Sequence, residues 1–172
     1  MDLKERPFLK KLICVFMVLV CLCSCNKNEI RPHLLGISFA AELMYFNEVY
    51  SFDGEILNDG TLIAVMKEPK ELEELKLTVK PDGIEADYKG LKYTANEATM
   101  PFSGIVKEVY ASLNSLMGKE SLIADDNGEI SAKVGQTDYL LTLSPTGLPQ
   151  RIELPGKHIS LNFYNVSITK EE

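Results

Sequence analysis

Apolar and polar residues alternate along most of the chain after residue 36, which is the pattern of strands with one buried face. The first run begins at Ile37, and alternate positions place four apolar side chains on one face: Phe39, Ala41, Leu43 and Tyr45. A second run over 49–57 reaches the turn-forming residues 58–60 (Asn-Asp-Gly), and a third run follows over 61–66. We therefore predict a strand followed by a hairpin with its tip at residues 58–60.

Shorter runs continue the sheet on both sides of one central segment. Before that segment we predict a helical turn and three short strands, at 70–76, 77–80, 84–88 and 91–94. After it we predict four strands, at 129–134, 138–143, 150–154 and 158–168. In the last strand the apolar parity changes between Phe163 and Tyr164, which indicates a bulge or a bend at a sheet edge.

The central segment has helical spacing. It begins after Thr99 and Pro101 and repeats apolar residues every three or four positions: Phe102, Ile105, Val106, Val109, Leu113, Leu116 and Met117. Gly118 is a natural C-terminal stop for this helix. Because the sheet offers the only large apolar surface, we expect the helix to pack across it. The sequence thus predicts an α+β fold, mainly β, with one antiparallel sheet covered by one central helix.

The N-terminus has the features of a bacterial lipoprotein export signal. Basic residues precede an apolar run over 12–22, which is far shorter than the roughly 20 residues that span a bilayer. The residues Leu-Cys-Ser-Cys that follow fit a lipobox, with the small Ser24 before the acceptor thiol of Cys25. We predict a signal-peptide helix within residues 1–24, cleavage between Ser24 and Cys25, and lipidation of Cys25. The alternatives are an ordinary secretory signal and an uncut N-terminal anchor.

The processed chain would keep a single cysteine, because all four cysteines lie at or before position 25. Disulfides, thiolate metal sites and cysteine nucleophiles are therefore excluded from the folded domain, which suits a compartment outside the reducing cytoplasm. Residues 26–35 carry polar and charged side chains, contain Pro32 and show no apolar period. We interpret residues 25–36 as a lipidated tether, 37–169 as one domain and 170–172 as a tail.

The net charge limits the classes of partner that the protein can bind. The chain carries 18 basic and 25 acidic residues, of which the signal region removes four and two, leaving a formal charge of −9. Such a surface repels phosphate backbones, so we do not expect nucleic acid as a partner.

No residue pattern indicates catalysis, a metal or a cofactor. His33 and His158 have no pairing spacing, and residues 125–129 (Asp-Asp-Asn-Gly-Glu) lack the spacing of a calcium loop and fit a turn better. Nucleophile-elbow, phosphate-loop and dinucleotide motifs are absent from the sequence. We therefore expect a protein that is not an enzyme.

Three stretches resemble the LolA/LolB-like superfamily, whose fold is a strongly curved half-barrel with an apolar concave face plugged by helices. They are GISFAAELMYFNEVYSFDGEI, DGTLIAVMKEPKEL and DYLLTLSPTGLPQRIELPGKHISLNFYNVSI, and the resemblance covers residues 36–168. The chain is also similar to small anchored lipoproteins of spore-forming bacteria, of the germination type GerS. It departs from the soluble carriers in two ways, because no helix precedes the first strand and the arginines outside the signal region, Arg31 and Arg151, are not on an early strand. The resemblance therefore implies the half-barrel and not the carrier mechanism.

The resemblance leaves two functions open. In the first, the concave face binds a lipid or acyl chain, unless the helix simply fills that space, and its expected lining is Phe39, Leu43, Tyr45, Tyr139, Leu141 and Phe163. In the second, the domain is a docking module that binds and localises another envelope protein, as in sporulation or germination, through a sheet edge or the acidic surface. In both, acyl chains hold the protein at the extracytoplasmic face of the cell membrane, where it could present a ligand but could not shuttle one.

Overall fold

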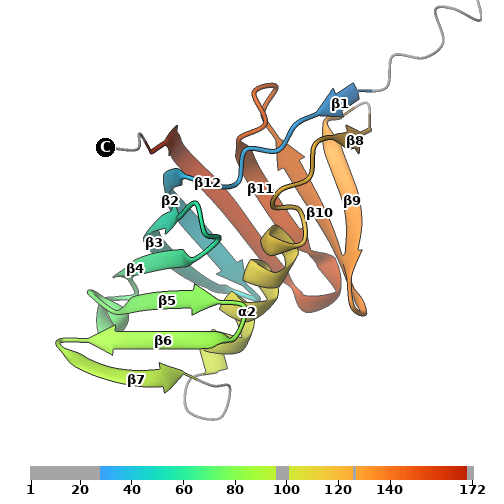
Figure 1. Ribbon diagram of the computed structural model, residues 1–172. Coiled ribbons are helices and arrows are strands. Elements are labelled where there is room, and N and C mark those ends of the chain that lie inside the picture. The colour runs from blue at the N-terminus through green and yellow to red at the C-terminus, as the bar shows by residue number, and fades with distance from the viewer. Residues whose placement is uncertain (1–27, 96–100, 126, 170–172) are drawn as a thin grey trace, which may run out of the picture.

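The dominant element of the fold is a ten-stranded antiparallel sheet that curves around the helix α2 (Pro101–Asn114) (Figure 1). The computed structural model describes residues 28–95, 101–125 and 127–169. In spatial order the strands are β7 (Leu91–Ala95), β6 (Gly83–Tyr88), β5 (Lys76–Lys80), β4 (Leu62–Glu68), β3 (Glu48–Ile56), β2 (Ile37–Tyr45), β12 (Ile159–Ile168), β11 (Pro149–Leu154), β10 (Thr137–Leu143) and β9 (Glu129–Val134). β7 and β9 are the two edges, so the sheet stays open. The expected mainly β, α+β class is confirmed, whereas the expected signal-peptide helix lies outside the described residues.

The order of the strands shows that the chain builds the sheet from two meanders. β2 to β7 form one half in sequence order, and β9 to β12 form the other. The halves join where β12 pairs with β2, with Ile37 opposite Ile168 and Tyr45 opposite Ile159. The first and last strands of the sheet therefore lie side by side at its centre.

Turn chemistry explains the hairpin between β3 and β4. The N–H of Leu57 donates to the carbonyl of Thr61 at 2.9 Å, and the carboxylate of Asp59 accepts from the N–H of Thr61 at 2.8 Å. Gly60 supplies the positive φ of 83° that the turn requires. The predicted tip at 58–60 is confirmed. The predicted helical turn after Pro69 is shorter than expected and is the 3₁₀ turn Lys70–Leu72.

The helix α2 (Pro101–Asn114) buries the predicted apolar stripe against the sheet. It ends three residues earlier than its stripe, because Leu116 and Met117 donate to the carbonyls of Leu113 and Asn114 in a tighter turn. Gly118 follows with a φ of 76°. Leu113 and Leu116 are almost completely buried, so the stripe continues through the turn although the α-helix does not.

The predicted bulge in the last strand is confirmed. The register of β12 against β2 shifts between Tyr164 and Ser167, and Asn165 takes a left-handed φ of 52°. Asn165 and Val166 therefore stand opposite the single residue Phe39 of β2, and pairing resumes one residue out of the earlier register, with Ile168 opposite Ile37.

Residues 28–36 are part of the folded body and not a tether. They contain β1 (Asn28–Ile30), which pairs with β8 (Leu122–Ala124) in a separate two-stranded sheet that the sequence did not predict. Leu34 is 2% exposed and belongs to the core. The tether prediction is therefore wrong for residues 28–36, which we call the N-terminal strap, and residues 25–27 lie outside the described part of the chain.

Two backbone hydrogen bonds hold the rest of the strap. The N–H of His33 donates to the carbonyl of Gly147 at 2.8 Å, and the N–H of Thr169 donates to the carbonyl of Gly36 at 2.7 Å. A Cβ on Gly147 would lie 1.9 Å from the carbonyl oxygen of Arg31, so only glycine lets the strap come this close.

Within the described ranges, no helix combines the length and apolar character needed to cross a bilayer.

Candidate functional site

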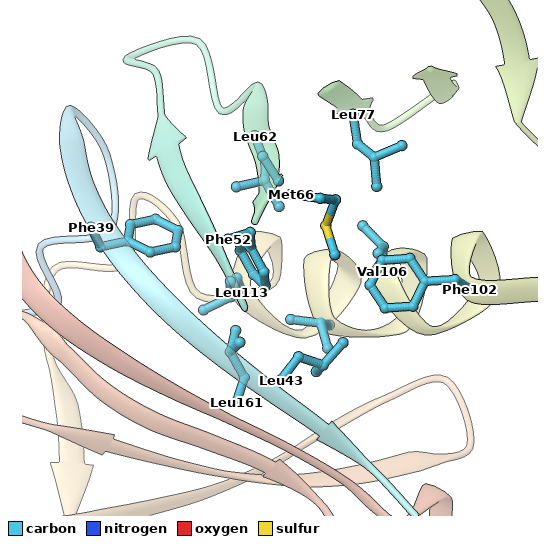
Figure 2. Close-up of a pocket in the computed structure, with 12 residues that line it drawn as sticks. Phe39, Leu43, Phe52, Leu62, Met66, Leu77, Phe102, Val106, Leu113 and Leu161 are labelled. Carbon is cyan, nitrogen blue, oxygen red and sulfur yellow. The ribbon is translucent and has the colours of Figure 1, made fainter. Parts of the chain in front are cut away.

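An apolar space lies where α2 crosses the concave face of the sheet (Figure 2). Twelve apolar side chains surround it, from β2 to β5 and β12 on one side and from the helix on the other: Phe39, Leu43, Phe52, Leu62, Ala64, Met66, Leu77, Leu161, Phe102, Val106, Val109 and Leu113. We call this set the apolar chamber. Its cavity volume is about 20 Å³, and a cavity needs about 10–15 Å³ to hold one water. The helix therefore fills nearly all of the space.

The structure brings two of the six expected lining residues to this chamber. Phe39 and Leu43 line it, whereas Tyr139, Leu141 and Phe163 are buried in the core outside its lining. Tyr45 is half-buried at the end of β2, edge-on to Phe46 with ring centroids 4.8 Å apart. Tyr139 lies instead against the turn that follows α2, with its hydroxyl 2.6 Å from that of Ser115.

An aromatic cluster closes one end of the chamber. The Phe39 ring lies edge-on to Phe52 and to Phe163, with centroid distances of 6.4 and 5.0 Å. It also lies directly over Gly54, where a Cβ would come within 2.3 Å of the ring. A glycine inside a strand indicates such close approach, so Gly54 was a readable signal that the sequence reasoning did not use.

Two hydroxyl contacts hold α2 against the sheet. The Tyr110 hydroxyl donates to the carbonyl of Gly60 at 3.0 Å, and the Ser115 hydroxyl lies 2.6 Å from the hydroxyl of Tyr139. Burial raises the pKa of both Tyr110 and Tyr139, and the nearby Asp59 raises that of Tyr110 further. Both hydroxyls are thus neutral hydrogen-bonding groups at neutral pH.

A third attachment of α2 is the half-exposed carboxylate of Glu108. It accepts a hydrogen bond from Thr137 at 3.2 Å and forms an ion pair with Lys157 at 3.5 Å. Partly exposed pairs of this kind contribute about 0–1 kcal/mol. Packing against the sheet, more than these polar contacts, therefore holds the helix in place.

The N-terminal end of α2 meets the sheet through Tyr50 and Phe102. Their rings are 4.4 Å apart between centroids and tilted by 32°. Burial, together with the hydrogen bond that the hydroxyl donates to Glu48, raises the pKa of Tyr50 to about 12.

A cluster of exposed apolar side chains lies at the end of the sheet where β2 turns into β3. Met44, Phe46 and Val49 are 42%, 58% and 44% exposed. The N–H of Phe46 donates to the carbonyl of His158 at 3.2 Å, and the two rings lie 4.8 Å apart. Phe46 and His158 both have left-handed backbones, with φ of 52° and 56°. We call Met44, Phe46 and Val49 the hairpin-end cluster.

Among the residues that the structure describes, the candidate polar side chains do not gather into a metal-binding cluster. In residues 28–95, 101–125 and 127–169, no group of three or more His, Cys, Asp or Glu side chains is placed to hold a metal ion. The Asp125 carboxylate accepts from the N–H groups of Glu129 and Asn127 at 2.8 and 2.9 Å, and these bonds hold its pKa below the usual value. The expected turn before β9 is confirmed. Ser24 and Cys25 lie outside the described residues.

Comparison with known proteins gives a likeness to solved structures but no sequence match. No family model and no curated protein matches the chain. Among solved structures, the chain is similar to the crystal structure of a LolA superfamily protein from Nitrosomonas europaea, with a TM-score of 0.35 and 6% sequence identity. The match covers 86% of this chain and 89% of that one. At this TM-score and identity, the likeness carries no information on function.

Proposed function

We propose that this protein is a membrane-anchored extracytoplasmic lipoprotein whose open half-barrel binds an apolar ligand, a lipid or acyl chain, between α2 and the concave face of the sheet. The observation that carries the proposal is the composition of the apolar chamber. All twelve of its lining residues are apolar, and an acyl chain presents no polar group for such a lining to satisfy. The lipobox ending at Cys25 supplies the anchor.

Ligand entry requires α2 to move away from the sheet, because the present cavity of about 20 Å³ holds no more than a water-sized group. The attachments of the helix support such a movement. Beyond packing, the described polar contacts between α2 and its surroundings, including the turn that follows it, are two hydroxyl contacts and the Glu108 interactions. An acyl chain would replace the apolar contacts that the helix gives up.

The proposal is tested by loading the soluble domain, residues 26–172, with a fluorescent fatty acid. We expect native mass spectrometry of the detergent-free domain to show added lipid mass, and cis-parinaric acid to gain fluorescence on binding. Ala64→Leu adds three carbon atoms to a chamber wall that is 3% exposed. We expect it to weaken cis-parinaric acid binding about tenfold, equivalent to about 1.4 kcal/mol.

Ala40→Leu is the matched control, because Ala40 lies on the opposite face of β2 between Tyr164 and Asp53. It makes the same change outside the chamber and should bind the probe as the wild type does. A domain that is always bare and binds no cis-parinaric acid would refute ligand binding, and equal loss in both variants would place binding outside the chamber.

The hairpin-end cluster favours a second candidate, a docking module that localises another envelope protein. Exposed aromatic and aliphatic side chains held on a strained backbone are typical of binding surfaces. Crosslinking through Phe46→Cys in the native envelope should then capture one recurring partner, and adding Met44→Ser and Val49→Ser to the same variant should weaken that capture. The absence of a recurring partner would contradict the docking function.

A further inference from the structure

The N-terminal strap fixes where a lipid anchor must lie relative to the domain. Cys25 precedes Asn28, the first residue of β1, by three positions. Three residues reach about 10 Å at most. Because β1 is hydrogen-bonded to β8 and the strap is held at Gly147, the domain cannot swing on a long tether. The end that carries β1 must therefore stay within about 10 Å of the acylated residue.

That end of the molecule has a side chain suited to the membrane interface. Ile123 of β8 is 59% exposed and lies directly opposite Glu29 of β1. Its neighbours on the ladder, Leu122 and Ile30, turn inward and pack on the core. An isoleucine held outward by a paired strand, within reach of the anchor, would gain free energy by entering the acyl boundary.

The charges around Ile123 permit such contact with an uncharged lipid surface. Glu29 and Arg31 of the strap are opposite in sign, and the turn at 144–147 (Ser-Pro-Thr-Gly) that supports the strap has no charged side chain. The carboxylate of Asp125, the residue after β8, is bound by two backbone N–H groups.

We propose that the end formed by β1, β8 and the turn at 144–147 is a membrane-contact surface that rests on the bilayer holding the acyl chains of Cys25, with Ile123 entering the interface. This inference rests on the lipidation in the proposed function. It also sets the orientation of the sheet. β2 runs away from this end for nine residues, about 30 Å at strand rise, so the hairpin-end cluster faces away from the membrane.

The test uses the processed, acylated protein, produced from the full-length chain, purified from membranes and reconstituted in phosphatidylcholine vesicles. A single cysteine at Ile123→Cys carries a bimane fluorophore, and lipids with a nitroxide near the headgroup quench it. Processing removes the other three cysteines, and acylation blocks the thiol of Cys25. Phe46→Cys is the matched control, because Phe46 is 58% exposed against 59% for Ile123 but lies at the opposite end of the sheet.

We expect quenching at position 123 to exceed that at position 46 by about twofold or more, because interfacial side chains sit about 5–10 Å into the headgroup region. Thr146→Cys, in the exposed turn, provides a second reporter if the change at position 123 disturbs β8. Equal quenching at all three positions, or stronger quenching at position 46, would overturn the inference.

The intact mass of the same sample tells failure of the membrane contact apart from failure of the proposed anchoring. A chain without the acyl mass on Cys25 would overturn both the anchoring and the membrane contact. An acylated chain whose labels at positions 123 and 146 are no more quenched than the control would overturn only the contact surface.

Discussion

Gly147→Ala tests whether the N-terminal strap is held by close backbone approach. Gly147 has a φ of 84°, and its added Cβ would lie 1.9 Å from the carbonyl oxygen of Arg31 and 3.4 Å from the nitrogen of His33. No rotamer change relieves contacts with backbone atoms, so the strap must move outward. Gly90→Ala is the control, because Gly90 has the same φ of 84° and no atom within 4 Å of its added Cβ.

Both variants lose stability through backbone strain, but only Gly147→Ala also loses the contacts of the strap. A left-handed backbone costs an L-residue about 1–2 kcal/mol, and we expect this loss in both. Moving the strap also breaks the hydrogen bond from His33 to Gly147, worth about 0.5–1.5 kcal/mol. It loosens Leu34, whose full burial contributes about 1.5–3 kcal/mol. Gly147→Ala should therefore lower the free energy of unfolding by about 1–4 kcal/mol more than Gly90→Ala.

Urea unfolding of residues 26–172, followed by far-ultraviolet circular dichroism, measures this difference, and hydrogen exchange locates it. Amide exchange over residues 28–36 should accelerate in Gly147→Ala and stay slow in Gly90→Ala. Equal unfolding free energies and equal exchange in the two variants would show that the strap is not fixed at Gly147. The strap would then not hold the membrane-contact surface close to the anchor.

Three further changes test the core, the aromatic contact and the anchor. Leu113→Ala, at a position 1% exposed on α2, should cost about 2–5 kcal/mol in urea unfolding, whereas Val49→Ala on the exposed hairpin end should cost far less. The pKa of Tyr50 is raised to about 12, so its contribution to stability is complete below pH 10 and is lost as the pH rises towards 12. As the pH rises across that range, the midpoint temperature of thermal unfolding should fall less steeply for Tyr50→Phe than for the wild type. Cys25→Ser should leave the protein unprocessed or released with an unchanged circular dichroism spectrum, and acyl labelling that persists in this variant would contradict the lipobox.

The features predicted best from the sequence are those that depend only on neighbouring residues. The hairpin tip at 58–60 needs only the αL tolerance of Gly60 and the side-chain acceptor of Asp59, both readable from adjacent residues. The bulge in β12 follows from a change of apolar parity between Phe163 and Tyr164, since a strand with one buried face must shift register there. Both signals lie within a few residues of the feature that they predict.

The strap and the chamber depend on contacts between distant parts of the chain. β1 is three residues long and pairs with β8 more than 90 positions later, so no periodicity could develop in either strand. Ile30 and Leu34 were apolar positions in a polar stretch, and the structure packs both on the core. The chamber lining depends on which strands α2 crosses. Alternation along β10 showed that Tyr139 faces inward but could not show that it packs against Ser115, after the end of α2, and not into the chamber.

Because β12 pairs with β2 at the centre of the sheet, the two halves of the sheet can join only after β12 has been made. β2 to β7 can form a meander as soon as they are made, but one side of β2 has no hydrogen-bonding neighbour until β12 is available. Closing a loop of more than 100 residues is slow compared with forming a hairpin. The sheet would therefore stay incomplete until β12 is available, and loss of the ten residues of β12 would deprive β2 and β11 of a shared partner.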